Sequence, residues 1–341
     1  MGKAAPVPAP VAGRRPIAEL QPGEHVNDQI YLVQDKDLRT TSNGSSYIHA
    51  ILADGSGRLV ARMWDATKAL FDGMPTGGFM RFRGRVETYK DKPQFIIDGM
   101  RTAEPGSFDP TDFLPHTPYD VETMWTRVKE ILRSIKNADL LALVARFVND
   151  REFVAAFKQA PAAAALHHAY LGGLLEHTLN LMELAVLIVP RYQELSLDLM
   201  LAAIFLHDAG KTRELTYGSS FGYSDEGQLV GHLVMCVTWL DQRAREVAQE
   251  TGKPFPADVL NVLKHLVLSH HGQYEYGSPK LPALPEAFVL HYLDNLDAKL
   301  ATCRAQINAN RDDASDWTGY IQALGTKLYK PDVTRPPDAA P

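Results

Sequence analysis

The sequence is poor in cysteine: only Cys236 and Cys303 occur among its 341 residues. They form no Cys-x-x-Cys pair, which argues against a disulfide framework and against a zinc site built from thiolates. Long apolar runs are scarce too, and the longest, residues 199–206, is far too short to cross a bilayer. Residues 1–15 are rich in Ala and Pro and lack the apolar segment of a signal peptide. We therefore expect a cytoplasmic protein that does not enter a membrane.

The sequence also lacks an excess of positive charge. It has 35 Lys and Arg residues against 41 Asp and Glu residues, a formal net charge of −6, which argues against indiscriminate coating of nucleic acid. Apolar residues make up 45% and charged residues 22%, as is usual for globular proteins. Because 341 residues exceed what one core usually accommodates, we expect two folded domains.

Histidine, in contrast, is crowded into one part of the chain. Three of the twelve histidines precede residue 160, and nine follow: His167, His168, His177, His207, His232, His265, His270, His271 and His291. Apolar residues at three- and four-residue steps around them predict helices over residues 163–189 and 197–206, one that begins at His232 and one that ends at His270. Ser196 should cap the helix over 197–206, and Gly210 should end it in the left-handed conformation.

The doublet His207-Asp208, with Lys211 beside it, combines imidazole, carboxylate and ammonium groups, which suits metal-dependent chemistry on phosphate. The doublet alone would also fit a helix end with solvated side chains. His177 lies on the apolar face of its helix, where a histidine is either a metal ligand or satisfied by a backbone carbonyl. Asp294 and Asp297 share one helical face, so one would be the ligand and the other would orient it or remain a surface charge.

In this order, the histidines and aspartates resemble those of the HD phosphohydrolase superfamily in its two-metal form. The strings His-Asp-Ala-Gly-Lys, Leu-Ser-His-His-Gly and Leu-Asp-Asn-Leu-Asp-Ala-Lys are similar to those of YhaM-type 3′-to-5′ exoribonucleases. We prefer Asp294 to Asp297 because the family's closing motif places its first carboxylate on the metal. The ligands that the resemblance implies are His177, His207, Asp208, His232, His270, His271 and Asp294.

The resemblance also implies a fold and a cofactor. The fold is multidomain, an N-terminal all-β OB-fold barrel followed by an all-α HD-type helical bundle. The cofactor is two divalent ions, with manganese first and iron or another transition metal as alternatives, since mixed imidazole and carboxylate ligands favour these over magnesium. We expect Asp208 to bridge the ions, and Lys211 to neutralise a phosphate oxygen or assist the leaving 3′ oxygen. Alternatively, Lys211 contacts carbonyls at the helix end.

The first third of the sequence supports the barrel independently. Short alternating runs predict strands over residues 29–34, 46–52, 58–64, 78–86 and 94–99, with tight turns at 54–57 and 90–93. Five strands of this length fit an OB-fold, which commonly binds single strands. We expect disordered tails over residues 1–15 and 331–341, the OB-fold over 16–108, a Pro-rich linker over 109–120 and the HD-type domain over 121–330.

Two kinds of side chain could contact nucleic acid. Arg81, Arg83 and Arg85 alternate along one strand and should point the same way, followed by Lys90 and Lys92 in the next turn, although a solvated strand face would look the same. Residues 16–108 contain eleven basic and twelve acidic residues, so any binding surface there must be local. Aromatic and histidine side chains could either contact the polymer or serve the core and the pocket rim: Tyr47, Trp64, Phe82, Tyr89, His168, Tyr217, Phe221 and Tyr223.

Our leading hypothesis is a metal-dependent exoribonuclease that trims single-stranded RNA from the 3′ end to nucleoside 5′-monophosphates. Single-stranded DNA as a second substrate and homo-oligomer formation are left open. One alternative is an HD-type phosphodiesterase of free or cyclic nucleotides. A non-catalytic nucleic-acid-binding protein is the other, and the complete ligand set argues against it.

Overall fold

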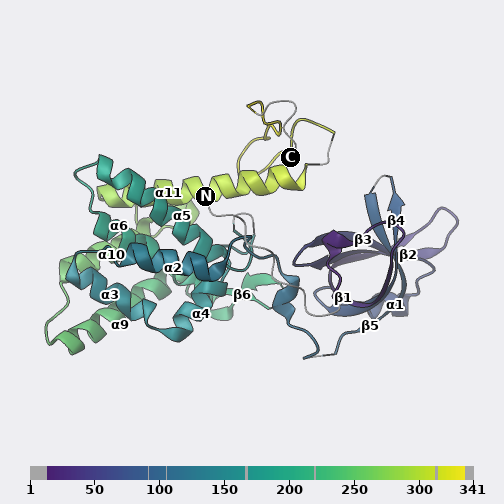
Figure 1. Cartoon of the computed structure of the whole chain (residues 1–341), viewed down its shortest axis with the longest axis horizontal. Coiled ribbons are helices and arrows are strands. Elements are labelled where there is room, and N and C mark those ends of the chain that lie inside the picture. The colour runs from purple at the N-terminus through teal and green to yellow at the C-terminus, as the bar shows by residue number, and fades with distance from the viewer. Residues whose placement is uncertain are drawn as a thin grey trace. The chain divides into compact units, whose positions relative to one another are not determined.

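The computed structural model describes residues 14–90, 92–104, 106–165, 168–218, 220–311 and 314–334. Its contacts divide the chain into two compact units (Figure 1). The barrel unit reaches to Asp120 and includes Thr216–Gly222, and the helical unit comprises Val121–Leu215 and the chain from Tyr223 onward. Most of the two predicted tails lies outside the described residues.

Five strands close into a barrel, which confirms the predicted all-β domain (Figure 1). They follow one another around the barrel as β1, β2, β3, β5 and β4, and only β3 and β5 run parallel. This is the strand order of an OB-fold. A short 3-10 helix, η1 (Ile17–Glu19), precedes the barrel, and α1 (Lys68–Asp72) joins β3 to β4. The strands are β1 (His25–Thr40), β2 (Ser46–Asp54), β3 (Gly57–Met63), β4 (Phe79–Tyr89) and β5 (Lys92–Thr102).

The alternation of β4 explains which side chains fill the barrel. Met80, Phe82 and Val86 are buried, whereas the three arginines between them face outward. The ring of Phe82 lies 6.4 Å from that of Tyr31 and 6.5 Å from that of Phe95. Phe82 therefore belongs to the core and is not available to stack on a base.

The predicted turn between β2 and β3 is present and is closed by Asp54. Its carboxylate accepts hydrogen bonds from the backbone N–H groups of Ser56 at 2.8 Å and Gly57 at 3.1 Å. It also accepts one from Ile17 at 2.9 Å, which ties η1 to the barrel. A buried carboxylate with three backbone donors is well satisfied, so Asp54 has a structural role.

The predicted linker begins too early. Phe113, in the 3-10 helix η2 (Pro110–Phe113), is only 1% exposed, and its ring lies 5.1 Å from Phe79 and 5.6 Å from Phe108. The Arg14 guanidinium lies 4.0 Å from the Phe113 ring centroid, so this part of the predicted tail is ordered. The prolines predicted an extended segment. The free energy gained by burying Phe113 outweighs this preference, and the first part of the segment packs onto the barrel.

The helical unit confirms the predicted all-α domain (Figure 1). Between α7 and α8 the chain forms a two-stranded hairpin of β6 (Leu215–Tyr217) and β7 (Phe221–Tyr223). Short 3-10 helices η3 (Val189–Arg191) and η4 (Tyr274–Tyr276) follow α5 and α10. The α-helices are α2 (Val121–Leu132), α3 (Ala138–Val148), α4 (Arg151–Gln159), α5 (Gly173–Ile188), α6 (Leu197–Leu206), α7 (Lys211–Glu214), α8 (Asp225–Leu229), α9 (His232–Thr251), α10 (Ala257–Ser269) and α11 (Pro285–Ala309).

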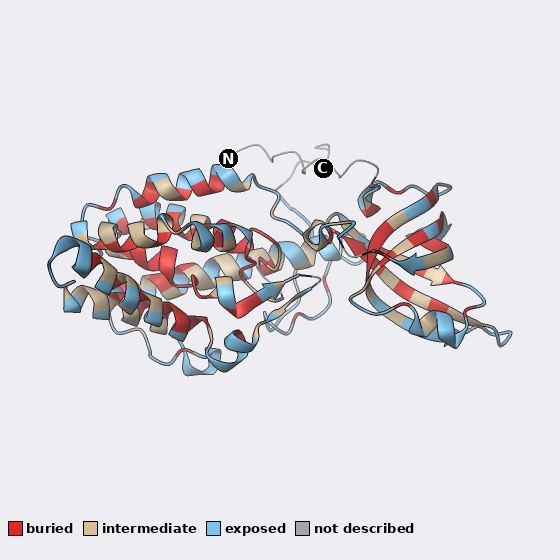
Figure 2. Ribbon diagram, turned by 90° about the horizontal axis from the view of Figure 1, so that it is seen from below, coloured by how far each residue is buried: buried red, intermediate tan, exposed pale blue. Residues whose placement is uncertain are grey.

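The core of this unit contains α5 and α6, and Figure 2 shows buried residues along the inner faces of the helices. Residues 200–206 are all buried, as expected for a helix that is apolar on every side. The Ser196 hydroxyl accepts a hydrogen bond from the Leu199 N–H at 3.3 Å, which confirms the predicted cap. Residues Gly173–Arg191 are long and apolar enough to span a membrane, but 56% of the tested window is buried, as in a core helix.

Two predictions about glycines and helix ends are wrong. Helix α5 begins at Gly173 and not near residue 163, because Gly172 adopts a φ of +78° and the chain turns there. A Cβ at Gly173 would lie 2.1 Å from the His168 carbonyl oxygen. Gly210 has a φ of −61°, which is right-handed, and a Cβ there would lie 2.3 Å from the His232 carbonyl oxygen. Glycine at 210 therefore permits a close backbone approach and is not a left-handed cap.

Candidate metal centre

Five helices bring the predicted ligands together. His177 lies within α5, and the doublet His207-Asp208 follows directly after α6. His232 is the first residue of α9, and the doublet His270-His271 follows α10. Asp294 comes from α11 and shares a group of close ligand atoms with His207 and His270. Two further groups with ligand atoms within 4.8 Å of one another are His177, His207, Asp208 and His232, His270, His271.

All five imidazoles in this cluster are held through Nδ1. Each partner is a carbonyl or carboxylate oxygen, so Nδ1 carries the proton and donates it, and Nε2 keeps its lone pair for a cation. Carbonyls in the last turn of a helix are free to accept such bonds. The bonds are His177 to Asp297 Oδ2 (2.7 Å), His207 to the Ile204 carbonyl (2.7 Å), His232 to Glu214 Oε1 (2.9 Å), His270 to the Val267 carbonyl (2.7 Å) and His271 to the Tyr276 carbonyl (2.9 Å).

The Asp208 carboxylate lies between two pairs of imidazoles. Its Oδ2 is 3.4 Å from His207 Nε2 and 3.9 Å from His177 Nε2. Its Oδ1 is 3.5 Å from His232 Nε2 and 3.6 Å from His270 Nε2. The two oxygens thus face different histidines, an arrangement that lets one carboxylate serve two cations.

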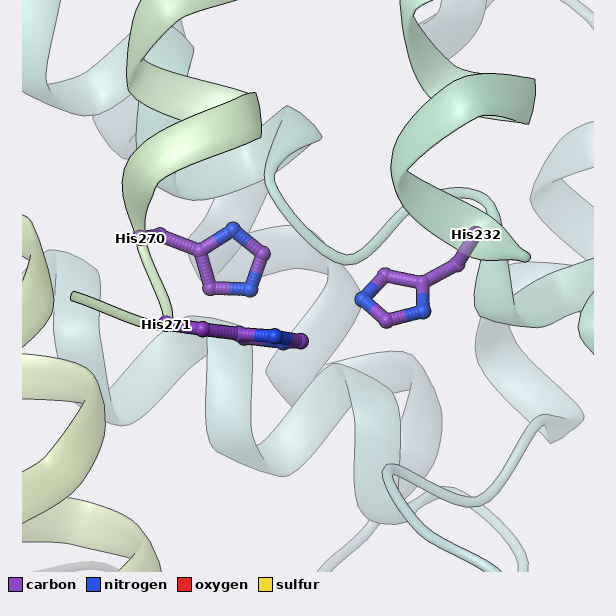
Figure 3. Close-up of side chains that lie close together, drawn as sticks. All are labelled: His232, His270 and His271. Atoms are coloured by element: carbon purple, nitrogen blue, oxygen red, sulfur yellow. The ribbon is translucent and has the colours of Figure 1, made fainter. Parts of the chain in front are cut away.

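The cluster fits a divalent metal. His207 Nε2, His232 Nε2 and Asp208 Oδ1 are buried and have no hydrogen-bond partner among the described residues. Buried polar atoms of this kind are rare and need an explanation, which a shared cation supplies. Figure 3 shows the rings of His232, His270 and His271 turned toward one another. Nitrogen and carboxylate ligands together suit transition-metal ions.

Lys211 forms a buried ion pair with Asp208 in the cluster. Its Nζ lies 2.7 Å from Asp208 Oδ2. Burial favours a protonated Asp208, but the Lys211 ammonium and His207 hold the pKa of this carboxyl well below its usual range. Burial likewise opposes the charged ammonium, yet Asp208 raises the pKa of Lys211. Both groups are therefore ionised at neutral pH, and the predicted alternative of a contact with helix carbonyls is not the one observed.

The histidines titrate differently from one another. Burial lowers the pKa of His270, and burial with the neighbouring His270 and His232 lowers the pKa of His271 to about 3. For His177, burial opposes protonation, but hydrogen bonds with Asp294 and Asp297 raise its pKa to about 10. In the absence of a metal, this raised pKa means that His177 keeps a second proton at neutral pH.

The structure argues against contact between His168 and the polymer, because both of its ring nitrogens are engaged within the site. Its side chain is buried, with Nδ1 2.7 Å from the Tyr170 hydroxyl and Nε2 2.7 Å from Asp297 Oδ2. Asp297 also accepts hydrogen bonds from His177 and, at 3.0 Å, from Asn180. His168 therefore positions the carboxylate that orients His177. His167, its neighbour in the sequence, lies outside the described residues.

The sequence analysis missed two further residues of the cluster. Glu214, at the end of α7, accepts hydrogen bonds from both the backbone and the ring of His232. His291, in α11, donates from Nδ1 to the His270 carbonyl at 2.9 Å. Spacing gave no signal for Glu214, whereas His291 belonged to the crowded histidines without a role.

The arginine stripe on β4 faces outward, but carboxylates already contact two of its members. Arg81 pairs with Asp28 at 3.2 Å and with Glu104 at 3.1 Å. Arg85 pairs with Glu87 at 2.8 Å and with Asp98 at 3.1 Å. The third arginine of the stripe, Arg83, is exposed and has no carboxylate partner among the described residues. The same holds for Lys90 and Lys92, which follow the stripe in the sequence.

A second surface of the barrel combines rings with a guanidinium, and we call Tyr47, Arg62, Trp64 and Tyr89 the Arg62 cluster. Arg62 lies 4.6 Å from the Tyr89 ring and 5.7 Å from the Trp64 ring, and the rings of Tyr47 and Trp64 are 5.0 Å apart. Trp64 is 44% exposed and Tyr89 is 46% exposed, so neither fills the core. In the β6–β7 hairpin, Tyr223 is exposed, and Tyr217 and Phe221 are half-buried.

The chain is similar to known proteins in sequence and, over a shorter part, in structure. The model of the HD domain family matches residues 174–299, a range that contains all seven predicted ligands. The "3′-5′ exoribonuclease YhaM" of Bacillus velezensis (strain DSM 23117 / BGSC 10A6 / LMG 26770 / FZB42) is 34% identical over 311 residues, which are 91% of this chain and 96% of that protein. Among solved structures, the solution structure of the second OB-fold domain of replication protein A from Methanococcus maripaludis covers 28% of this chain and 99% of its own, with 16% identity and a TM-score of 0.22.

Proposed function

The chain belongs to the family of the 3′-5′ exoribonuclease YhaM, and from this premise we propose that it hydrolyses single-stranded RNA from the 3′ end to nucleoside 5′-monophosphates. The observation that carries the proposal is the placement of Asp208, whose two oxygens face two different pairs of imidazoles. A carboxylate with this geometry is suited to a two-metal phosphodiesterase. We place the enzyme in the cytoplasm.

The residues divide into two ligand sets around Asp208. His177 and His207 lie on the Oδ2 side, and Asp294 Oδ1 is 3.2 Å from His177 Nε2. The other set, on the Oδ1 side, is His232, His270 and His271. We assign manganese to both positions, with iron as the alternative. When bound, two such ions supply an activated water and neutralise the phosphate.

Lys211 is the group we assign to the leaving oxygen. Its ammonium is held by Asp208 at the centre of the cluster and can supply both positive charge and a proton. In the hydrolysis, the oxygen of a water would form a new bond to phosphorus while the bond to the 3′ oxygen of the preceding nucleotide breaks, and that 3′ oxygen would take the proton of Lys211. The products are a nucleoside 5′-monophosphate and an RNA one nucleotide shorter.

For capture of the strand, we favour the Arg62 cluster over the arginine stripe. Bases stack on exposed aromatic rings whatever their sequence, and a guanidinium among the rings adds attraction for the polymer. Two arginines of the stripe already pair with carboxylates, which compete with phosphate. Stacking does not depend on the 2′-hydroxyl, so single-stranded DNA should bind to the same surface.

A single digestion experiment tests the activity. The purified protein is stripped of metal, reloaded with manganese and incubated with 5′-labelled RNA, 5′-labelled DNA and a cyclic dinucleotide. We expect 5′-labelled RNA fragments that shorten one nucleotide at a time, released nucleoside 5′-monophosphate, and no reaction in the presence of a chelator. Cleavage of the cyclic dinucleotide alone, or cuts in the interior of the RNA, would show that the proposal is wrong.

A further inference from the structure

We propose that Glu214 is the positioning residue for one of the two metal positions, the one formed by His232, His270 and His271. The inference rests on the proposed function, because it concerns the same pair of ions. Glu214 does not face the cation in our assignment. It acts through His232, whose ring it fixes with Nε2 directed at Asp208.

One oxygen of Glu214 holds both the backbone and the side chain of His232. Oε1 accepts a hydrogen bond from the His232 backbone N–H at 3.0 Å and another from Nδ1 at 2.9 Å. The carboxylate itself is buried, and its residue is 8% exposed. Two contacts from one fixed oxygen leave the ring little freedom to rotate, and they set the tautomer that presents Nε2.

The position of His232 in its helix explains why it needs a partner from elsewhere. His207 and His270 follow the C-terminal ends of helices, where carbonyls of the last turn accept their Nδ1 protons. His232 is the first residue of α9, and the start of a helix offers N–H groups rather than free carbonyls. Gly231, before it, contributes no capping side chain. The carboxylate of Glu214 supplies the missing acceptor, and its negative charge suits a helix N-terminus.

The backbone around Glu214 is shaped for this contact. A Cβ at Gly227 would lie 2.3 Å from the Glu214 carbonyl oxygen, and that oxygen accepts a hydrogen bond from the Ser224 N–H at 2.9 Å. Gly231 adopts a φ of +77° and passes Glu214 Oε1, which a Cβ there would approach to 3.8 Å. Gly227 therefore lets the segment before α9 pack closely against the end of α7, and Gly231 provides the left-handed backbone conformation directly before His232.

Each of the two ligand sets contains one imidazole whose Nδ1 donates to a carboxylate. Of the five imidazoles, only His177 and His232 have a carboxylate on Nδ1, and they belong to different sets. Asp297 therefore supports one metal position, and Glu214 supports the other. A carboxylate partner makes an imidazole a stronger donor, and its loss typically weakens metal binding by about 10- to 100-fold.

The test is the number of manganese ions bound per chain and the affinity of each. We compare the full-length wild type with Glu214→Ala, Glu214→Gln and the control Glu226→Ala, which removes an exposed glutamate of α8. Binding is measured by equilibrium dialysis with elemental analysis and by the electron paramagnetic resonance signal of coupled manganese pairs. For Glu214→Ala we expect one ion to bind as in the wild type and the affinity for the other to fall by about 10- to 100-fold. At low manganese concentration the signal of coupled pairs should be absent.

The conservative variant separates positioning from a merely structural role. Glu214→Gln keeps an oxygen that accepts both hydrogen bonds but loses the negative charge, so it should bind the second ion more tightly than Glu214→Ala does. Glu226→Ala should be indistinguishable from the wild type. If Glu214→Ala fails to fold, Glu214→Asp replaces it in the test. The shorter side chain withdraws the carboxylate from His232 by one methylene, so the affinity for the second ion should again fall. Two ions at wild-type affinity in the alanine or aspartate variant would overturn the inference. A wild type that binds a single ion would instead refute the two-metal function itself.

Discussion

The barrel and the helical unit both contain buried polar atoms without a hydrogen-bond partner among the described residues, but they distribute them differently. In the barrel strands these atoms belong to Gln34, Arg62 and Gln94, which lie on three different strands. In the helical unit they include His207 Nε2, Asp208 Oδ1 and His232 Nε2, and both histidine nitrogens lie close to the Asp208 carboxylate. Scattered unsatisfied atoms are local costs of folding, whereas atoms that converge indicate a ligand.

Charge is distributed just as differently. Arginines of the barrel face solvent and form exposed ion pairs, which contribute about 0 to 1 kcal/mol each. In the helical unit, Lys211 and Asp208 form a buried pair, and removing one partner of such a pair is strongly destabilising or disrupts function. Substitutions of charged residues should therefore have small effects in the barrel and large ones in the metal centre.

The largest effect should come from the doublet. His207→Ala and Asp208→Asn each remove a ligand at the centre of the cluster, so we expect strongly reduced bound metal and a fall in RNA hydrolysis of about 1000-fold or more. RNA affinity, measured by fluorescence anisotropy, should stay near that of the wild type if the barrel captures the strand. Near-normal turnover in either variant would contradict the metal assignment, and a matching loss of RNA affinity would break the division between the units.

Lys211 should give the next largest effect. If its ammonium stabilises charge that develops only in the transition state, Lys211→Ala lowers kcat and kcat/KM together by about 100-fold, with metal content unchanged. Lys211→Arg should restore little, because a planar guanidinium does not replace a compact ammonium. Steady-state kinetics and elemental analysis of both variants check this. A variant that melts earlier but turns over normally would assign Lys211 a structural role only.

These expectations show which parts of the site the sequence could predict. The candidate ligands and the helices that carry them were predictable, because helical periodicity is local and His207 and His270 each follow a helix whose apolar pattern is clear. The Nδ1 partners were not, since Asp297 is 120 residues from His177 and Glu214 is 18 residues from His232. Gly210 was misinterpreted for the same reason: the atom that requires it to be glycine belongs to His232, in another helix.

In the barrel, the strands and turns were predictable from alternation and turn residues, but the cluster that we propose as the binding surface was not. The arginine stripe is regular in sequence, whereas the Arg62 cluster unites residues of β2, β3 and β4 with Trp64, which directly follows β3. Only strand register, which is tertiary information, places these side chains together.

The comparison can be sharpened within the barrel by two sets of variants. Replacing Arg62 and Trp64 by Ala should weaken RNA binding by about 10-fold, the value of one lost stacking contact. The triple alanine variant of the arginine stripe should lose less affinity and lower the salt slope by about 1 rather than 3, because carboxylates already engage two of its arginines. Anisotropy titrations over a range of salt concentrations distinguish them. The reverse order of effects would identify the stripe as the RNA surface.

The smallest expected effect is the release of a proton from His177 when manganese binds. The pKa of His177 is raised from 6.5 to about 10, so in the metal-free chain its contribution to stability is fully present below pH 6.5 and is lost as the pH rises toward 10. A cation that binds at Nε2 must displace this proton, so manganese binding should release up to about one proton between these values and strengthen with pH. Calorimetry in buffers of different ionisation enthalpy measures the release. No buffer dependence would mean that His177 is already neutral.

The positions of the site residues along the chain determine the order in which they are synthesised. Asp294 and Asp297 lie on α11, the last of the described α-helices, whereas His168 and His177 leave the ribosome more than a hundred residues earlier. A nascent chain can fold its barrel before either carboxylate has been synthesised. The candidate metal centre is completed only when α11 docks, so a ribosome-bound fragment that stops short of α11 lacks the two aspartates that contact His177. Assembly of the candidate metal centre thus depends on the synthesis and docking of α11, which carries both aspartates.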